Sequence, residues 1–192
     1  MRFLMRFANQ GRYGPRDAKN LSSSCYEVVK AYGADIGNLR VSGTAVELDV
    51  LLSSREHLKA ATNGLESKLG RLLTSRELDV PTPQMDPDLA VREGIQLFNE
   101  ERYWESHESL EWAWRRAEGS EKEILQGIIL TAAALVHLQK NDETVALSIM
   151  KRAEGKLAGH EGRHWGVDVP ALRGTLAKMI ESRRIEFFRI PS

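Results

Sequence analysis

The segment FNEERYWESHESLEWAWRRAEGSEKEILQGIILTAAALVHLQKN, residues 98–141, sets the architecture of the C-terminal half of this chain. Apolar and aromatic residues recur in it every three or four positions, which is the period of an amphipathic helix. Gly119 and Ser120 interrupt this period, so the segment is predicted to form two antiparallel helices with a turn at that point. The small residues Gly127, Thr131 and Ala132–Ala134 should allow these two helices to approach each other closely.

His107 is the central polar residue of the first predicted helix. On a helical wheel it falls on the apolar side, together with Tyr103, Leu110 and Trp114. Its ring is therefore predicted to be largely buried. Glu111 lies one turn further along and could reach the same partner as His107.

The second predicted helix supplies polar residues that could meet this cluster. If the turn lies at Gly119, Gln126 or Gly127 should face Glu111. His137 should lie near Tyr103 and Glu100, about 9 Å along the helix axis from the point opposite His107. The candidate groove therefore comprises Tyr103, His107, Glu108, Glu111, Trp114, Gln126 and His137.

The order of these residues resembles a known family, the domain of unknown function three hundred and nine. The family pattern is Phe-Asn, an aromatic residue, Glu-x-His-Glu-x-x-Glu-x-x-Trp, and then a Leu-Gln-Gly-x-Ile helix with a histidine and an asparagine near its end. It is matched here by Phe98, Asn99, Tyr103, Glu105, His107, Glu108, Glu111, Trp114, Leu125, Gln126, Gly127, Ile129, His137 and Asn141.

The resemblance covers roughly residues 88–158, and it implies a small all-helical bundle with no established reaction. This sequence departs from the family pattern at two places. Glu101 stands where the family usually has glycine, and Val145-Ala146 stands where Gly-Ala is usual. The turn before Tyr103 is affected by the first departure, whereas the polar cluster is not affected by either.

The cluster has three interpretations, which predict different chemistry. Glu111 and Gln126 could satisfy a buried His107 in a structural network that fixes the helix register. His107 and Glu111, one turn apart and next to Glu108, could instead share a divalent metal ion, as in a metalloprotease-like helix. A third interpretation is a metal-free pocket in which His107 acts as an acid or base, or binds a small ligand or a protein partner.

Residues 1–80 follow a different period and are predicted to form an α+β domain. Strands are expected at Arg2–Phe7, Asn38–Ser42, Thr44–Leu52 and Leu72–Leu78, with helices over Asp17–Tyr32 and from Ser54 to Gly70. The order β-α-β-β-α-β is that of ferredoxin-like sandwiches. An RNA-binding version needs exposed aromatic residues on the third strand, and Thr44–Leu52 has none, which disfavours nucleic acid as a partner.

The proline-rich residues 81–87 are predicted to be a linker between this domain and an all-α bundle of about five helices, residues 88–192. Beyond the central pair, the sequence predicts helices after Asp88, after Asn141 and around Leu172–Ile180, and a loop over Gly162–Pro170. The tail from Arg183 onward carries Phe187 and Phe188 among arginines. Docking of this tail on the other domain is favoured over binding to an acidic partner, because paired exposed phenylalanines are rare.

Composition describes a globular protein whose charge is unevenly distributed. Charged residues make up 28% and the formal net charge is zero, yet residues 79–123 carry 12 acidic and five basic side chains. These acidic side chains either pair with basic faces of the fold or attract a cation. Cys25 is the single cysteine, so no intrachain disulfide can form, and together with the lack of a signal peptide or membrane span this predicts a cytoplasmic protein. A homo-oligomer is compatible with the sequence.

Overall fold

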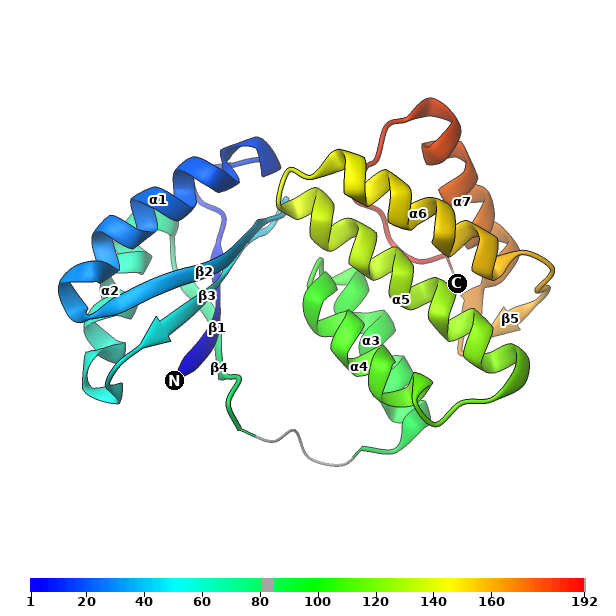
Figure 1. The fold of residues 1–192 in the computed structure, drawn as a ribbon, viewed down its shortest axis with the longest axis horizontal. Helices are drawn as coiled ribbons and strands as arrows, with labels where there is room; N and C mark the ends of the chain where they lie inside the picture. The colour runs from blue at the N-terminus through cyan, green and yellow to red at the C-terminus, as the bar shows by residue number, and fades with distance from the viewer. Residues whose placement is uncertain (81–84, 192) are drawn as a thin grey trace. The chain divides into compact units, whose positions relative to one another are not determined.

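The structure is a computed structural model and describes residues 1–80 and 85–191 (Figure 1). The chain divides into two compact units, Met1–Pro83 with Gln139–Asn141, and Gln84–Leu138 with Asp142–Ser192. Of the predicted linker 81–87, residues 81–84 lie outside the described residues, and Pro87 is already the first residue of a helix.

The N-terminal unit is an α+β structure built on one four-stranded antiparallel sheet. Its elements are β1 (Arg2–Ala8), α1 (Ala18–Val29), β2 (Ala34–Val41), β3 (Ala45–Leu52), α2 (Leu58–Leu69) and β4 (Leu72–Glu77). The strands are ordered β2-β3-β1-β4, so β1 and β3 are central. The predicted order of strands and helices is confirmed, although β2 begins at Ala34 and contains an irregularity between Ile36 and Leu39.

Alternation along the strands gives this sheet two chemically different faces. Phe3, Met5 and Phe7 of β1 pair with Val50, Leu48 and Val46 of β3, and all six side chains belong to one apolar core with α1 and α2. The opposite face carries a charged group of residues. There Arg40 donates to Glu47 (2.6 Å) and to Asp49 (2.9 Å), and Arg2 donates to Asp49 (2.6 Å).

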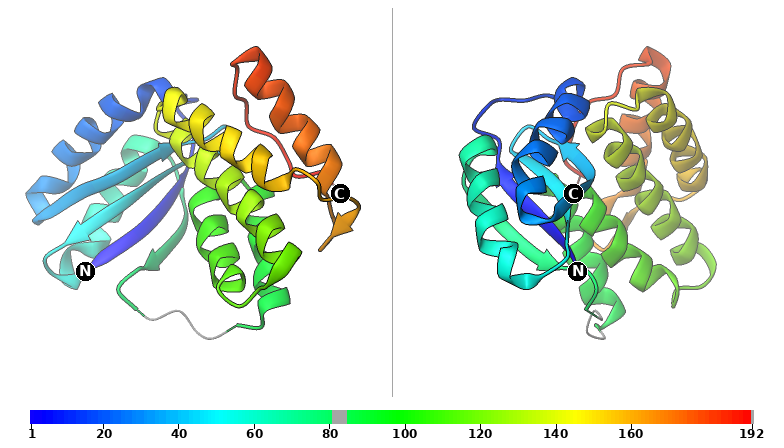
Figure 2. Two further views of the ribbon diagram at one scale, coloured as in Figure 1. Left: turned by 45° about the vertical axis from the view of Figure 1, so that its right-hand side comes forward. Right: turned by 60° about the vertical axis from the view of Figure 1, so that its left-hand side comes forward.

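The second unit contains five α-helices among the described residues. They are α3 (Pro87–Asn99), α4 (Tyr103–Trp114), α5 (Gly119–Gln139), α6 (Glu143–Leu157) and α7 (Val169–Ser182). Figure 2 shows the same helices in two further views, in which α5 and α6 lie side by side. Asp86 caps α3 by accepting from the N–H groups of Asp88 and Leu89, and Pro87 at the first helical position needs no such partner.

The helices form two consecutive hairpins that repeat at an offset of 40 residues. Glu101 (φ +61°) joins α3 to α4, and Asn141 (φ +63°) joins α5 to α6. Each turn is closed by the same backbone bond, from Arg102 N–H to Leu97 C=O in the first hairpin and from Asp142 N–H to His137 C=O in the second, both 2.9 Å. The buried positions also repeat, with these pairs: Val91 and Thr131, Phe98 and Leu138, Ser106 and Ala146, Leu110 and Met150, Ala113 and Ala153.

Glycine allows close helix contact at one position of each hairpin. A Cβ atom on Gly94 of α3 would lie 2.6 Å from Leu110 Cγ on α4. A Cβ atom on Gly127 of α5 would lie 2.5 Å from Leu157 Cδ2 on α6. Gly127 therefore allows α5 to approach α6, whereas the small residues were predicted to bring together the two helices of residues 98–141.

Two predictions for the C-terminal segment are wrong. The segment predicted as a loop over Gly162–Pro170 contains a short hairpin, β5 (Arg163–His164) with β6 (Val167–Asp168), and α7 begins at Val169. The tail after α7 docks on the helical unit itself, whereas docking on the other domain was predicted. Phe187 stacks on Tyr103 with ring centroids 5.8 Å apart, and Ile190 N–H donates to Asn99 Oδ1 at 2.8 Å.

Candidate functional site

His107, Glu108 and Glu111 lie together on one partly exposed flank of α4. Their side chains are 31%, 49% and 32% exposed, respectively. One ligand atom from each residue can be chosen so that all three atoms lie within 4.8 Å of one another. The prediction that the His107 ring is largely buried is therefore wrong.

The buried stripe of α4 explains this difference. It consists of Tyr103, Ser106, Leu110 and Ala113, all buried. At 100° per residue the centre of this stripe lies roughly 80° from His107. Ser106 occupies a core position, and a serine there gives no apolar signal in the sequence.

The hydrogen-bond network predicted between His107, Glu111 and Gln126 is also wrong. Glu111 Oε1 accepts from Arg115 Nη2 at 3.0 Å, one helical turn along α4. His107 Nδ1 lies 3.6 Å from Glu108 Oε1, beyond hydrogen-bonding distance. Among the described residues, no hydrogen bond joins Gln126 to either side chain.

Gln126 lies in a different place, in a groove formed by α5 and α6. This groove has a volume of about 500 Å³. Its lining consists of Glu123, Gln126 and Leu130 from α5, and Arg152, Gly155, Lys156 and Ala158 from the end of α6 and the residue after it. The predicted single groove is thus divided, with His107 on α4 and Gln126 in the α5–α6 groove.

Tyr103 belongs to the core and does not line an open pocket. Its ring is fully buried and meets Phe98 edge-on at 4.9 Å between centroids. Burial, with a smaller effect of the Glu101 charge, raises the pKa of the phenol, so the group stays protonated at neutral pH. Neither Tyr103 Oη nor the buried Ser106 Oγ has a hydrogen-bond partner among the described residues.

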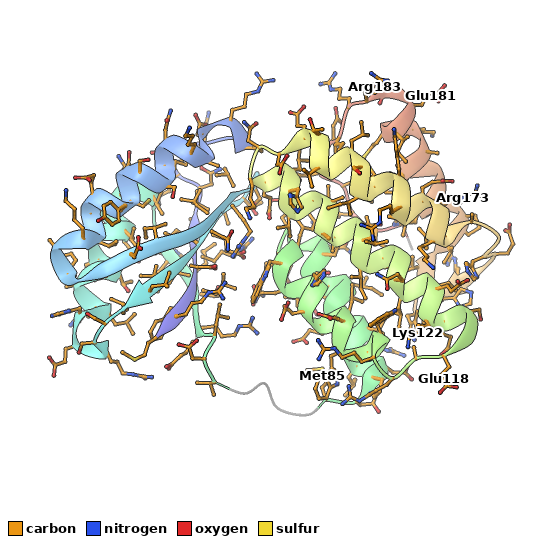
Figure 3. All side chains as sticks on the ribbon, in the orientation of Figure 1. Met85, Glu118, Lys122, Arg173, Glu181 and Arg183 are labelled. Carbon is orange, nitrogen blue, oxygen red and sulfur yellow. The ribbon has the colours of Figure 1, made fainter. Side chains whose placement is uncertain are left out.

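Trp114 and His137 are each held by one local contact. The ammonium of Lys122, labelled in Figure 3 near the start of α5, lies 4.8 Å from the centroid of the half-buried Trp114 ring. His137 Nδ1 lies 3.3 Å from Asp142 Oδ2 across the turn between α5 and α6. His137 is not part of the three-residue cluster, in agreement with its predicted distance from His107.

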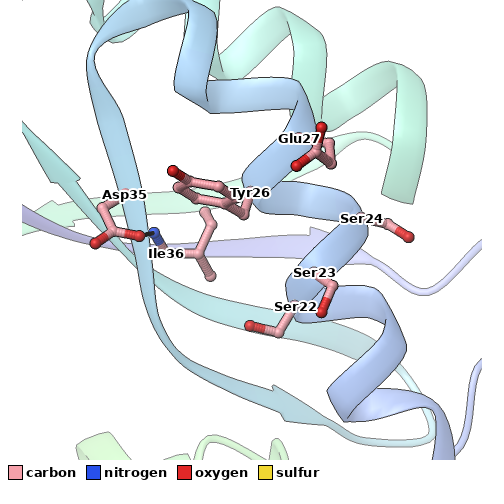
Figure 4. Close-up of a pocket in the computed structure, with 7 residues that line it drawn as sticks. All are labelled: Ser22, Ser23, Ser24, Tyr26, Glu27, Asp35 and Ile36. Atoms are coloured by element: carbon pink, nitrogen blue, oxygen red, sulfur yellow. Dashed lines mark hydrogen bonds between the residues drawn. The ribbon is translucent and has the colours of Figure 1, made fainter.

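A hollow in the N-terminal unit was not predicted from the sequence. Figure 4 shows it between α1 and β2, lined by Ser22, Ser23, Ser24, Tyr26, Glu27, Asp35 and Ile36, with a volume of about 620 Å³. The run of three serines is the only signal that could have indicated it. Cys25 follows that run but points into the core, where burial raises its pKa to about 11, so the thiol is not a nucleophile at neutral pH.

The α4 cluster has the donor set of a divalent-cation site. Imidazole and carboxylate ligands bind zinc, manganese or iron, with metal–ligand distances of about 2.0–2.2 Å for zinc. Ligand atoms around one ion are then roughly 3–3.5 Å apart. The three side chains are partly exposed, so they can rotate until their ligand atoms, now within 4.8 Å of one another, reach this spacing. Arg115 competes with such an ion for Glu111.

The fold and cluster describe a helical domain with a partly exposed His/Glu face, and part of this domain matches a known family model. Residues 91–149 match the family model described as "Domain of unknown function (DUF309)". Residues 91–149 of the helical unit are therefore similar to this family, and the resemblance predicted from the sequence is confirmed. Glu101, where the resemblance implies a glycine, has a left-handed backbone conformation (φ +61°), which glycine adopts most readily.

Among solved structures, the chain is similar to a conserved hypothetical protein from Thermus thermophilus. The two are 34% identical, and the match covers 46% of this chain and 93% of that chain with a TM-score of 0.41. A search of curated proteins finds no match. Within the part of the chain that the structure describes, no helix has both the length and the apolar character needed to cross a membrane.

Proposed function

We propose that the DUF309 domain of this protein binds a divalent metal ion through His107, Glu108 and Glu111. The observation that carries the proposal is the approach of their ligand atoms to within 4.8 Å on one accessible helix flank. The structural interpretation required a buried His107 satisfied by Gln126, and neither condition holds. The surplus of acidic side chains in residues 79–123 adds a favourable field for a cation.

The roles of the three residues follow from their chemistry. His107 would supply a neutral ring nitrogen, and the two carboxylates would supply charge that offsets the ion. Three protein ligands leave further coordination positions for water or for a bound molecule. The proposal stops at binding.

Calorimetric titration of the full chain with zinc and with manganese chloride tests the proposal. We expect one site, with His107→Ala and Glu111→Gln each weakening it at least tenfold. Glu118→Gln is the matched control, because it removes the same charge from an exposed position outside the cluster. Arg115→Ala should strengthen binding by freeing Glu111 from its ion pair.

Two outcomes would contradict metal binding at this cluster. One is the absence of saturable heat with either ion, and the other is equal affinity of His107→Ala and wild type. The metal-free stability of His107→Ala is a separate measurement. If the ring is only partly exposed and has no structural role, His107→Ala should change the free energy of unfolding by no more than about 0.5 kcal/mol. A structural role predicts that the variant loses about 2–4 kcal/mol of this free energy.

We also propose a ferredoxin-like N-terminal domain and a separately folded helical domain. The order β1-α1-β2-β3-α2-β4 and the sheet order β2-β3-β1-β4 support a ferredoxin-like sandwich in residues 1–80. The division into two compact units supports separate domains on either side of residues 81–87. Circular dichroism of a fragment covering residues 85–192 tests this, since a spectrum that is not predominantly helical would contradict it.

The remaining parts of the proposal concern location and partners. A single buried cysteine is compatible with a cytoplasmic protein. A small molecule or another protein, and not nucleic acid, is the proposed partner class. Fractionation of cells that express the protein, with an antibody against it, would reveal any location other than the cytoplasm.

A further inference from the structure

The groove between α5 and α6 has the size of a small-molecule site. Its volume of about 500 Å³ falls within the range of about 300–1,000 Å³ that such sites usually have. Both of its walls come from the helical unit, with α5 and α6 side by side in Figures 1 and 2. The α4 cluster contributes none of its lining residues.

Two cations lie on the same side of this groove. Arg152 and Lys156 are one helical turn apart on α6, so both side chains project from the same face of the helix. Glu123, on the opposite wall, lies 3.6 Å from Lys156 Nζ and 3.4 Å from His160 Nε2. Within residues 85–191, no carboxylate pairs with the Arg152 guanidinium, so the groove keeps an uncompensated positive charge.

Gln126 adds a neutral polar group to the same lining. Its amide makes no hydrogen bond among the described residues, although the side chain is only partly exposed. An amide can donate to an anion and can accept from a hydroxyl group. The lining therefore combines a planar guanidinium, an ammonium and an unengaged amide donor.

The first hairpin shows what the corresponding position looks like when it is filled. Trp112 and Arg116 correspond to Arg152 and Lys156 at the 40-residue offset. There the Arg116 guanidinium lies 3.7 Å from the centroid of the Trp112 ring, and Trp112 Nε1 donates to Met85 C=O at 2.9 Å. The second hairpin has an arginine in place of this indole, and its groove stays open.

Gly155 also keeps the groove open. A Cβ atom at this position would meet nothing within 4 Å, so packing does not require a glycine. Its φ angle is not positive, so the backbone does not require one either. A longer side chain at this position would extend into open space at the groove lining.

We propose that the α5–α6 groove binds a small organic anion through a phosphate or carboxylate group. Arg152 contacts two oxygen atoms of the anion with its fork of N–H donors, and Lys156 and Gln126 contact the remaining ones. Leu130 and Ala158 contact the apolar part of the molecule. This site is separate from the proposed metal site, and neither depends on the other.

The test uses the full chain and three probes of similar size, with binding followed by calorimetry and by the NMR signals of the Gln126 side-chain amide. Phenyl phosphate and benzoate carry the two anionic groups, and benzyl alcohol is the neutral control. We expect saturable binding of at least one anionic probe and none of benzyl alcohol. A preference for phenyl phosphate identifies a phosphate ligand, and a preference for benzoate identifies a carboxylate.

Variants locate the binding and separate it from general charge attraction. Arg152→Gln should weaken binding of the preferred probe at least tenfold. Gly155→Gln should prevent its binding, because the glutamine side chain would fill the groove. Lys151→Gln removes the same charge from the adjacent exposed position, outside the groove lining, and should change affinity less than twofold. Equal losses for Arg152→Gln and Lys151→Gln, or no saturable binding of either anion at millimolar concentration, would overturn the proposal.

Discussion

The α3–α4 hairpin and the α5–α6 hairpin use the same plan at an offset of 40 residues, yet they carry different polar groups. In the first, the buried face includes two hydroxyl groups, on Tyr103 and Ser106, and the exposed flank carries His107. In the second, Ala146 is buried where the first hairpin has Ser106, and Leu147 stands where it has His107. Charge instead gathers beside the second hairpin's groove, at Arg152 and Lys156.

This difference shows how one packing scheme can present two kinds of site. The repeated turn and the repeated apolar contacts fix where each helix lies. Positions outside those contacts can then change chemistry without changing the fold. According to the two proposals above, the first hairpin would supply ligands for a cation and the second would supply donors for an anion. The comparison can be tested at matched positions by chemical unfolding followed by tryptophan fluorescence, because all four tryptophans lie in the helical unit.

The largest expected effect is at the helix crossing of the first hairpin. Gly94→Ala places a Cβ atom 2.6 Å from Leu110 Cγ and 3.4 Å from the Leu110 backbone nitrogen, so α3 and α4 must move apart. We expect a loss of about 2–3 kcal/mol in the free energy of unfolding. The matched change Ala134→Gly in the second hairpin should cost about 1 kcal/mol, mainly through helix propensity. Equal losses of unfolding free energy for Gly94→Ala and Ala134→Gly would show that the two helix crossings are equally close.

The next effect concerns the buried hydroxyl of Ser106. Ser106→Ala removes an oxygen that has no hydrogen-bond partner among the described residues, and should stabilise the protein by about 1 kcal/mol. Ala146→Ser introduces the same group at the matched buried position and should destabilise it by a similar amount. If Ser106→Ala instead lowers the unfolding midpoint, the hydroxyl has a stabilising partner and the two buried faces differ for another reason.

An effect no larger than that of Ser106→Ala is expected at the two turns. Glu101→Gly should be more stable than Glu101→Ala by about 1 kcal/mol, since both lose the side chain but only glycine accepts φ +61° without strain. Asn141→Gly should raise the free energy of unfolding by a smaller amount, because asparagine tolerates the left-handed region better than glutamate does. A Glu101→Gly variant no more stable than Glu101→Ala would mean that the first turn is not strained.

Much of the fold could be predicted from the sequence because its elements have strong periods. The alternation of Phe3, Met5 and Phe7 and the two helices within residues 98–141 were interpreted correctly, although α5 begins at Gly119, where a turn was predicted. The hairpin at Arg163–Asp168 was missed because each of its strands has only two residues, too few to show a period.

The candidate site was predicted less well, for a physical reason that lies in α4. Three tryptophans, at positions 104, 112 and 114, made several sides of this helix look apolar, whereas a serine occupies the core position next to His107. The estimated buried side was therefore rotated toward His107. The clustering of His107, Glu108 and Glu111 survived this error because it depends only on the spacing along one helix. The position of Gln126 relative to His107 depends on how three helices pack together, and residue spacing along a single helix cannot predict that packing.

The docked C-terminal tail has a consequence for how the protein is made in the cell. The bond from Ile190 N–H to Asn99 Oδ1 joins positions 91 residues apart, and Phe188 meets Phe98 at 5.4 Å between ring centroids. Synthesis proceeds from the N-terminus, so α3 leaves the ribosome several seconds before the tail does, at about 5–20 residues per second. During that interval the apolar surface around Phe98 and Tyr103 lacks its native cover. The contacts of Phe188 and Ile190 with α3 can therefore form only after nearly the whole helical unit has left the ribosome.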